Sequence, residues 1–75
     1  MNNQLLDLKG LSCPLPVLRT KKAIQSLIKG GVIEVHVTDP VAVNDFQAFC
    51  QATGNELVNW QQDGEVYAFT IRKAA

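Results

Sequence analysis

The chain has 75 residues, of which 47% are hydrophobic and 19% charged, so it suits one small globular domain and is too apolar for a disordered segment. Seven basic and seven acidic residues give a net charge of zero, which argues against bulk binding of nucleic acid. The charge is nevertheless divided: residues 1–33 carry 5 − 1 = +4 and residues 34–75 carry 2 − 6 = −4. This division predicts that one basic face steers an acidic partner.

The ends and the cysteine count indicate where the protein works. The N-terminus shows no cationic start, long apolar stretch or cleavage site, so we expect no secretion signal, no membrane segment and a cytoplasmic protein. Two cysteines in such a chain favour free thiols over a disulfide. We find no linker or repeat and predict a single domain over residues 1–75.

The first half of the chain predicts a strand, a helix and a second strand. Residues 5–9 alternate partly and end at Gly10, which is typical of a strand. Residues 14–29 have helical spacing and end at Gly30-Gly31. The predicted inward stripe of that helix is Val17, Thr20, Ile24, Leu27 and Ile28. Residues 32–38 alternate cleanly, which indicates a half-buried strand.

The second half predicts a helix followed by a hairpin. Asp39 is a suitable N-cap for a helix with Pro40 at its first position, and Gly54 would end that helix. Strands are expected over residues 56–61 and 66–72, joined by a tight turn at Asp63-Gly64. The predicted inward stripe of the helix is Ala42, Phe46, Phe49, Cys50 and Thr53. The fold class is therefore α+β, a two-layer βαβαββ sandwich whose mixed four-stranded sheet has both helices on one face.

Cys13 lies where the first strand gives way to the first helix, followed by Pro14, Leu15 and Pro16. A thiol caps a helix poorly, so a cysteine at this point indicates chemistry. With Cys13 as N-cap, neither proline has an N–H and Leu15 offers the one remaining donor, which together with the helix dipole would favour a thiolate. A free thiol is only about 3% ionised at pH 7, so such activation would matter. The alternative is a small buried hydrophobe.

The rest of the chain offers Cys13 little help for other cysteine chemistries. The one histidine, His36, falls on the polar face of the second strand, and nothing places it near Cys13 as a base. A thioredoxin-type site needs a C-x-x-C pair, and a zinc site needs about four ligands, so we predict no metal and no cofactor. Cys50 falls on an apolar stripe and is expected in the core. A solitary reactive thiol that serves other proteins fits best.

The sequence resembles the TusA/SirA-like sulfur-carrier family along nearly its whole length. The matching features are Asp7, Gly10, the Cys13-Pro14-Leu15-Pro16 motif, Lys21-Lys22, Gly30-Gly31, Asp39-Pro40, Phe49-Cys50 with Thr53-Gly54, and Ile71-Arg72-Lys73. The resemblance implies a two-layer βαβαββ fold. It also implies that Cys13 holds a covalent persulfide as transient cargo, positioned by Gly10 and the motif, and acts as a sulfurtransferase-type relay rather than a stand-alone enzyme.

The same resemblance implies two protein partners. A sulfur donor, either a cysteine desulfurase or a rhodanese-like protein, would load Cys13, and an acceptor protein would unload it. Arg19, Lys21 and Lys22 would dock the donor, unless they form an ordinary solvated helix face. The tRNA-thiolation members resemble C-P-E-P, whereas Leu15 stands in this motif and Thr38 precedes Asp39, so the pathway stays open between tRNA thiolation and another sulfur or selenium route.

Two other functions remain open from the sequence. Cys13 could form a mixed disulfide or a sulfenic acid as a redox regulator. A basic helix on a small α/β sandwich could bind the backbone of RNA or DNA. No aromatic-rich strand accompanies this helix, so direct nucleic-acid binding is the less favoured interpretation. The exposed sheet face leaves room for an oligomer.

Overall fold

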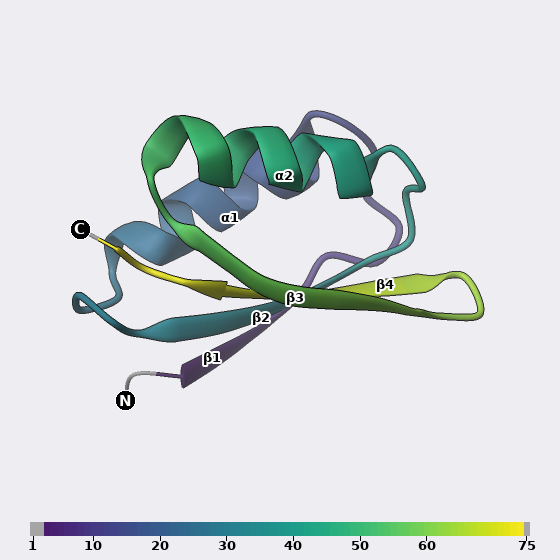
Figure 1. Cartoon of the computed structure of the whole chain (residues 1–75). Helices are drawn as coiled ribbons and strands as arrows, with labels where there is room; N and C mark the ends of the chain where they lie inside the picture. The colour runs from purple at the N-terminus through teal and green to yellow at the C-terminus, as the bar shows by residue number, and fades with distance from the viewer. Residues whose placement is uncertain (1–2, 75) are drawn as a thin grey trace.

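The computed structural model describes residues 3–74 and has two layers, a four-stranded sheet and two helices that cover one of its faces (Figure 1). The elements in chain order are β1 (Asn3–Asp7), α1 (Leu15–Gln25), β2 (Val32–Val37), α2 (Ala42–Thr53), β3 (Glu56–Asp63) and β4 (Val66–Arg72). The sheet order is β1-β2-β4-β3; β1 and β2 are parallel, and the other two pairs are antiparallel. The predicted fold class is confirmed.

The core lies between the sheet and the helices because every second residue of the central strands points that way. Ile33, Val35 and Val37 of β2 are completely buried, as their alternation predicts. From the neighbouring strand, Phe69 stacks on Phe46 of α2 with ring centroids 4.6 Å apart. Cys50 is buried one turn after Phe46, which confirms its prediction as a core residue.

The first helix ends earlier than its periodicity predicts. α1 stops at Gln25 instead of residue 29, and the backbone N–H groups of Ser26 and Leu27 donate to carbonyls three residues back. The Lys73 Nζ donates to the Gln25 carbonyl oxygen at 3.5 Å, which is one of the helix-end acceptors, and to the Leu27 carbonyl oxygen just beyond the helix at 2.7 Å. Ile28 is therefore 60% exposed, and its predicted inward position is wrong.

The second helix begins later than predicted. α2 starts at Ala42 with Val41 as N-cap, because residues 39–41 form a turn in which the Ala42 N–H donates to the Asp39 carbonyl oxygen. Thr53 is exposed rather than inward-facing, and its hydroxyl donates to the Phe49 carbonyl oxygen one turn back.

The strand bounds also differ slightly from the prediction. β1 lies two residues earlier than residues 5–9, and β3 extends to Asp63 with an irregularity between Leu57 and Asn59. No helix in the described range 3–74 is long and apolar enough to cross a membrane.

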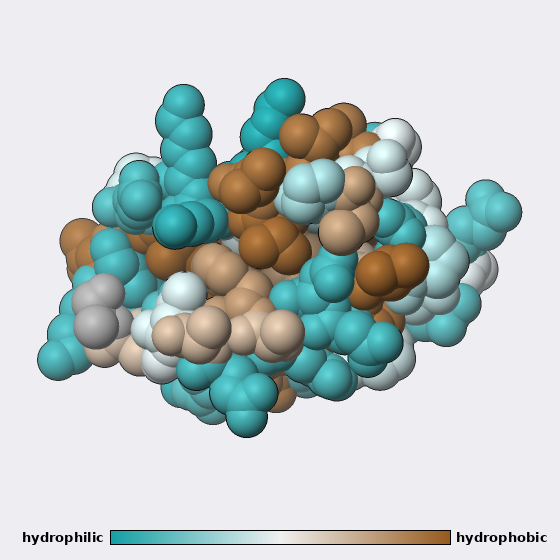
Figure 2. Space-filling view, turned by 90° about the horizontal axis from the view of Figure 1, so that it is seen from above, coloured by the Kyte–Doolittle hydropathy of each residue, from teal (hydrophilic) through white to brown (hydrophobic). Residues whose placement is uncertain are grey.

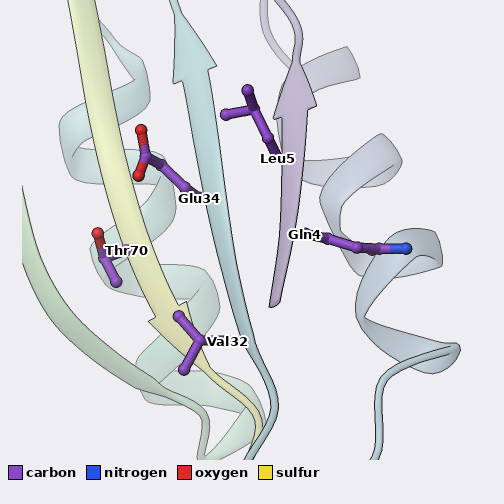
Figure 3. A pocket seen from close by; sticks show the side chains of 5 residues that line it. All are labelled: Gln4, Leu5, Val32, Glu34 and Thr70. Carbon is purple, nitrogen blue, oxygen red and sulfur yellow. The ribbon is translucent and has the colours of Figure 1, made fainter. Parts of the chain in front are cut away.

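The face of the sheet turned away from the helices is uncovered in the structure. Figure 3 shows part of it, with Leu5, Glu34, Val32 and Thr70 around a shallow hollow of about 390 Å³. His36 lies on the same face, where its ring contacts the Glu34 carboxylate. The sulfur-bearing loop belongs to the other side of the molecule.

Candidate functional site

Cys13 is exposed in the loop between β1 and α1. The helix begins at Leu15 with Pro14 as its N-cap, one residue later than predicted, and the Cys13–Pro14 peptide bond is cis. The Leu15 N–H donates to the Ser12 carbonyl oxygen at 3.0 Å. The prediction that Cys13 caps the helix and that this N–H serves its sulfur is therefore wrong, because the loop's own backbone already uses the donor.

Two hydrogen bonds tie the cysteine loop to the segment that joins β2 to α2. The Gly10 N–H donates to the Thr38 hydroxyl at 3.0 Å, and the Cys13 N–H donates to the Asp39 carboxylate at 2.8 Å. The other oxygen of Asp39 accepts the Val41 N–H at 3.1 Å. Asp39 thus links the loop that carries the sulfur to the start of the second helix.

Gly10 has a specific conformational reason to be glycine. Its φ is +87°, in the left-handed region that other residues avoid, and its N–H is the donor that reaches Thr38. The structure thus shows why glycine suits this position, and the positioning role of Gly10 stays a prediction. Pro16, the second helical residue, is buried and anchors the other end of the loop.

The sulfur lies at a shallow hollow between the two helices. This hollow has a volume of about 370 Å³ and is lined by Cys13, Pro14, Val17, Asp45, Ala48 and Phe49. The helices and the turn before α2 also expose Leu15, Leu18 and Val41. Figure 2, seen from the helix side, shows such apolar side chains gathered among hydrophilic ones. The site is a surface depression with one carboxylate in it.

The surroundings raise the pKa of the Cys13 thiol. The largest cause is its hydrogen bond to the Asp45 carboxylate, followed by partial desolvation and by the negative charges of Asp45 and Asp39. The expected promotion of a thiolate is therefore wrong for the free protein. The two carboxylates come from the second helix (Asp45) and from the turn before it (Asp39).

Comparison with known proteins identifies the family. Residues 4–73 match the family model described as sulfurtransferase TusA. The chain belongs to the TusA family. It is 46% identical over 72 residues to the sulfur carrier protein TusA of Allochromatium vinosum, covering 96% of this chain and 95% of that protein. It is 42% identical over 72 residues to the putative sulfur carrier protein YrkI of Bacillus subtilis, covering 96% of each chain.

A solved structure agrees with the sequence comparison. The crystal structure of a SirA-like protein from Desulfitobacterium hafniense superposes with a TM-score of 0.83 at 30% identity, covering 96% of this chain and 99% of that one. The predicted resemblance to the TusA/SirA-like family is confirmed.

In this TusA-family chain the three predicted docking residues do not line the sulfur hollow. Arg19 and Lys22 border a separate hollow of about 520 Å³ on α1. With about 100° per residue, both fall on the side of the helix opposite Val17, whereas Lys21 follows Val17 by one turn. All three are exposed. They surround the site at a distance rather than acting on the sulfur.

The second cysteine and the histidine take no part in the site. Cys50 is buried, which raises the pKa of its thiol. His36 lies on the opposite face of the sheet. Among residues 3–74, no three His, Cys, Asp or Glu side chains come together as ligands for a metal ion.

Sequence reasoning missed Asp45 and Phe49 as site residues and the bridging role of Asp39. Asp39-Pro40 resembled a simple N-cap, and nothing in one sequence indicated that its second oxygen would reach Cys13. Phe49 was on the predicted inward stripe of the helix, and Asp45 precedes it by one turn. Helical spacing could therefore have indicated that Asp45 lies on the same side.

Proposed function

We propose that this protein carries sulfane sulfur as a persulfide on Cys13, receiving it from one protein and delivering it to another. The observation that supports this most directly is the contrast between its two thiols. Cys13 is exposed in a loop that three backbone N–H bonds hold in place, whereas Cys50 is in the core. Membership of the TusA family and the names of its relatives, which are sulfur carriers, support sulfur as the cargo.

Each transfer conserves the oxidation state of the sulfur. The Cys13 sulfur attacks the terminal sulfur of the donor's R–S–SH group, a new S–S bond forms to Cys13, and the donor's S–S bond breaks. The donor sulfur leaves as a thiolate and takes up the proton that Cys13 loses. Delivery repeats the exchange, with an acceptor nucleophile attacking the terminal sulfur of Cys13–S–SH and Cys13 leaving. No oxidant or metal takes part in either step.

An exposed site suits this exchange because both reacting sulfurs belong to proteins. The apolar lining of the hollow at Cys13, which includes Pro14, Val17 and Phe49, gives a partner surface to bury. A persulfide-bearing loop of a cysteine desulfurase or a rhodanese-like protein is the donor we propose. Because the hollow at Cys13 is shallow and open, the proposed partner at each step is a protein rather than an enclosed small molecule.

The basic residues of α1 would then guide the donor rather than activate the sulfur. Arg19, Lys21 and Lys22 are exposed, and charges at the rim of an interface mainly raise the rate of association. Reversing all three to glutamate should slow loading at low donor concentration by about tenfold or more, and salt should reduce the difference. Equal loading rates at all salt concentrations would reject this docking role.

The test is intact-protein mass spectrometry after incubation with a cysteine desulfurase, its cofactor and cysteine, without reductant. The expected result is a gain of one sulfur atom, ~32 Da, that dithiothreitol removes. The gain should be absent in Cys13→Ala and present in Cys50→Ala. If neither a desulfurase nor a rhodanese loads the protein, while peroxide or oxidised glutathione modifies Cys13 readily, the carrier function is refuted in favour of redox regulation.

A further inference from the structure

Asp45 and Cys13 share one hollow although they come from different elements. Asp45 lies in the first turn of α2, is half-buried, and lines the same hollow as Cys13, where its carboxylate raises the pKa of the thiol. The other lining side chains are those of Pro14, Val17, Ala48 and Phe49, none of which can donate to or neutralise the carboxylate. Among the residues that line the hollow, Asp45 is therefore the one charged group beside the sulfur.

We propose that Asp45 is a positioning residue that restrains Cys13 while the carrier is free, so that small thiols do not draw sulfur from it. This inference rests on the proposed function of Cys13 as a persulfide carrier. The restraint has two parts. The carboxylate holds the thiol proton in the unloaded protein, and its charge opposes both an approaching anionic thiolate and the development of negative charge on Cys13 as it leaves.

The charged groups around the sulfur all act in the same direction. Asp45 faces it from α2, and Asp39 faces it from the turn before α2, with one oxygen bonded to the Cys13 N–H. On α1, the nearest cation by helical position is Lys21, one turn beyond Val17 and outside the hollow. Removing the charge of Asp45 should therefore leave Asp39 as the sole opposing carboxylate.

The reaction that Asp45 opposes is simple thiol exchange. A glutathione thiolate attacks the terminal sulfur of Cys13–S–SH, a bond forms between these two sulfurs, and the bond from Cys13 Sγ to the terminal sulfur breaks. Cys13 leaves as a thiolate and takes a proton from water, and glutathione persulfide is released, with no change in the oxidation state of the transferred sulfur. A thiol of higher pKa leaves more slowly, so a carboxylate beside Cys13 prolongs the life of the cargo.

The first measurement is the pH profile of Cys13 alkylation by iodoacetamide, a neutral reagent that reports thiolate directly. A unit charge at hydrogen-bond range in water changes an ionisation equilibrium roughly fivefold. In Asp45→Asn, Cys13 should therefore be alkylated roughly fivefold faster near pH 7, and the midpoint of its alkylation profile should lie at lower pH. Asp45→Glu keeps the carboxylate and should show the slow wild-type profile. The matched control is Glu34→Gln, which removes a carboxylate from the opposite face of the sheet (Figure 3) and should leave the profile unchanged.

The second measurement is the rate at which glutathione removes sulfur from the loaded protein, followed as the loss of ~32 Da. Asp45→Asn should release sulfur roughly two- to fivefold faster than wild type, from the weaker restraint on the leaving thiolate and on the approaching anion. Comparable urea midpoints for the variants would show that the effect does not come from misfolding.

The outcomes separate the two proposals. If wild-type Cys13 never accepts sulfur, the carrier function fails, while the alkylation profile still decides whether Asp45 restrains the thiol. If Cys13 loads but Asp45→Asn alkylates and releases sulfur at wild-type rates, the role of Asp45 is overturned and the carrier function stands. Faster alkylation with unchanged release would also overturn the proposed protection of the cargo.

Discussion

Replacing Asp39 tests whether the sulfur loop is held by the second helix. In Asp39→Ala two hydrogen bonds disappear: the one from the Cys13 N–H at 2.8 Å and the one from the Val41 N–H at 3.1 Å. Loss of a side chain that satisfies an N–H at a helix start costs about 1 kcal/mol. Loss of a partly exposed bond from a backbone N–H to a carboxylate costs about 1 kcal/mol more.

The variant should thus be about 2 kcal/mol less stable, which for a domain of this size lowers the melting temperature by roughly 10 °C. Asp39→Asn keeps one carbonyl oxygen as acceptor, so it should lose about half as much. Urea unfolding can be followed by the fluorescence of Trp60, which lies on the sheet with its ring centroid 6.2 Å from that of Phe69.

The matched control is Glu65→Gln, which removes an exposed carboxylate from the β3–β4 turn and should change the free energy of unfolding by less than about 0.5 kcal/mol. If Asp39→Ala unfolds at the same urea concentration as this control, Asp39 does not hold the loop to α2. A change in the urea slope without a change in midpoint would also contradict the reasoning, because it would indicate an altered unfolded state.

Four further results are expected. In the native protein at pH 7, iodoacetamide should label Cys13 more slowly than it labels free cysteine, because the pKa of Cys13 is raised, and should reach Cys50 only after unfolding. Burial raises the pKa of Cys50 in the folded protein, so the neutral thiol contributes its full stability below the unfolded pKa of about 8.5. As pH rises above that value, the free energy of unfolding should decline. The decline should be smaller in Cys50→Ala. Phe46→Ala should lose about 4 kcal/mol of unfolding free energy in urea, and an unchanged midpoint would exclude Phe46 from the core. Gly10→Ala should lose about 1 kcal/mol in the same assay, because alanine is strained at φ +87°; no loss would mean that the loop adopts another conformation.

The fold could be predicted because its strongest signals are local. The alternation of β2 placed Ile33, Val35 and Val37 in the core, and Gly54, with φ +78°, ends α2 where the sequence indicated. The end of α1 could not be predicted from periodicity: the backbone tightens at Ser26 and Leu27, and Lys73, far along the chain, donates to the Gln25 and Leu27 carbonyl oxygens. Periodicity describes one segment and carries no information about such a distant donor.

The site could be predicted only as a position. Cys13 was found from its place between a strand and a proline-rich helix start, and Gly10 from its place at the end of a strand. The sign of the electrostatic effect was wrong, because the basic residues adjacent in sequence lie along α1, whereas the carboxylates that face the sulfur come from Asp45 and Asp39. The net charge of the neighbouring sequence is a poor guide to the electrostatic environment of a side chain when a second helix packs beside it.

Asp39 contributes both to the position of Cys13 and to its reactivity, whereas Thr38 acts on position and Asp45 on reactivity. Hydrogen bonds from the Gly10 and Cys13 N–H groups to the side chains of Thr38 and Asp39 hold the loop that carries the sulfur. The hollow around the sulfur contains no lysine, arginine or histidine that could stabilise a thiolate. Because the carboxylates near Cys13 oppose ionisation, we expect a group that promotes transfer, such as a cation placed at the hollow, to come from the partner protein. The protection from small thiols proposed for Asp45 would follow from the same requirement, since a small thiol brings no such cation.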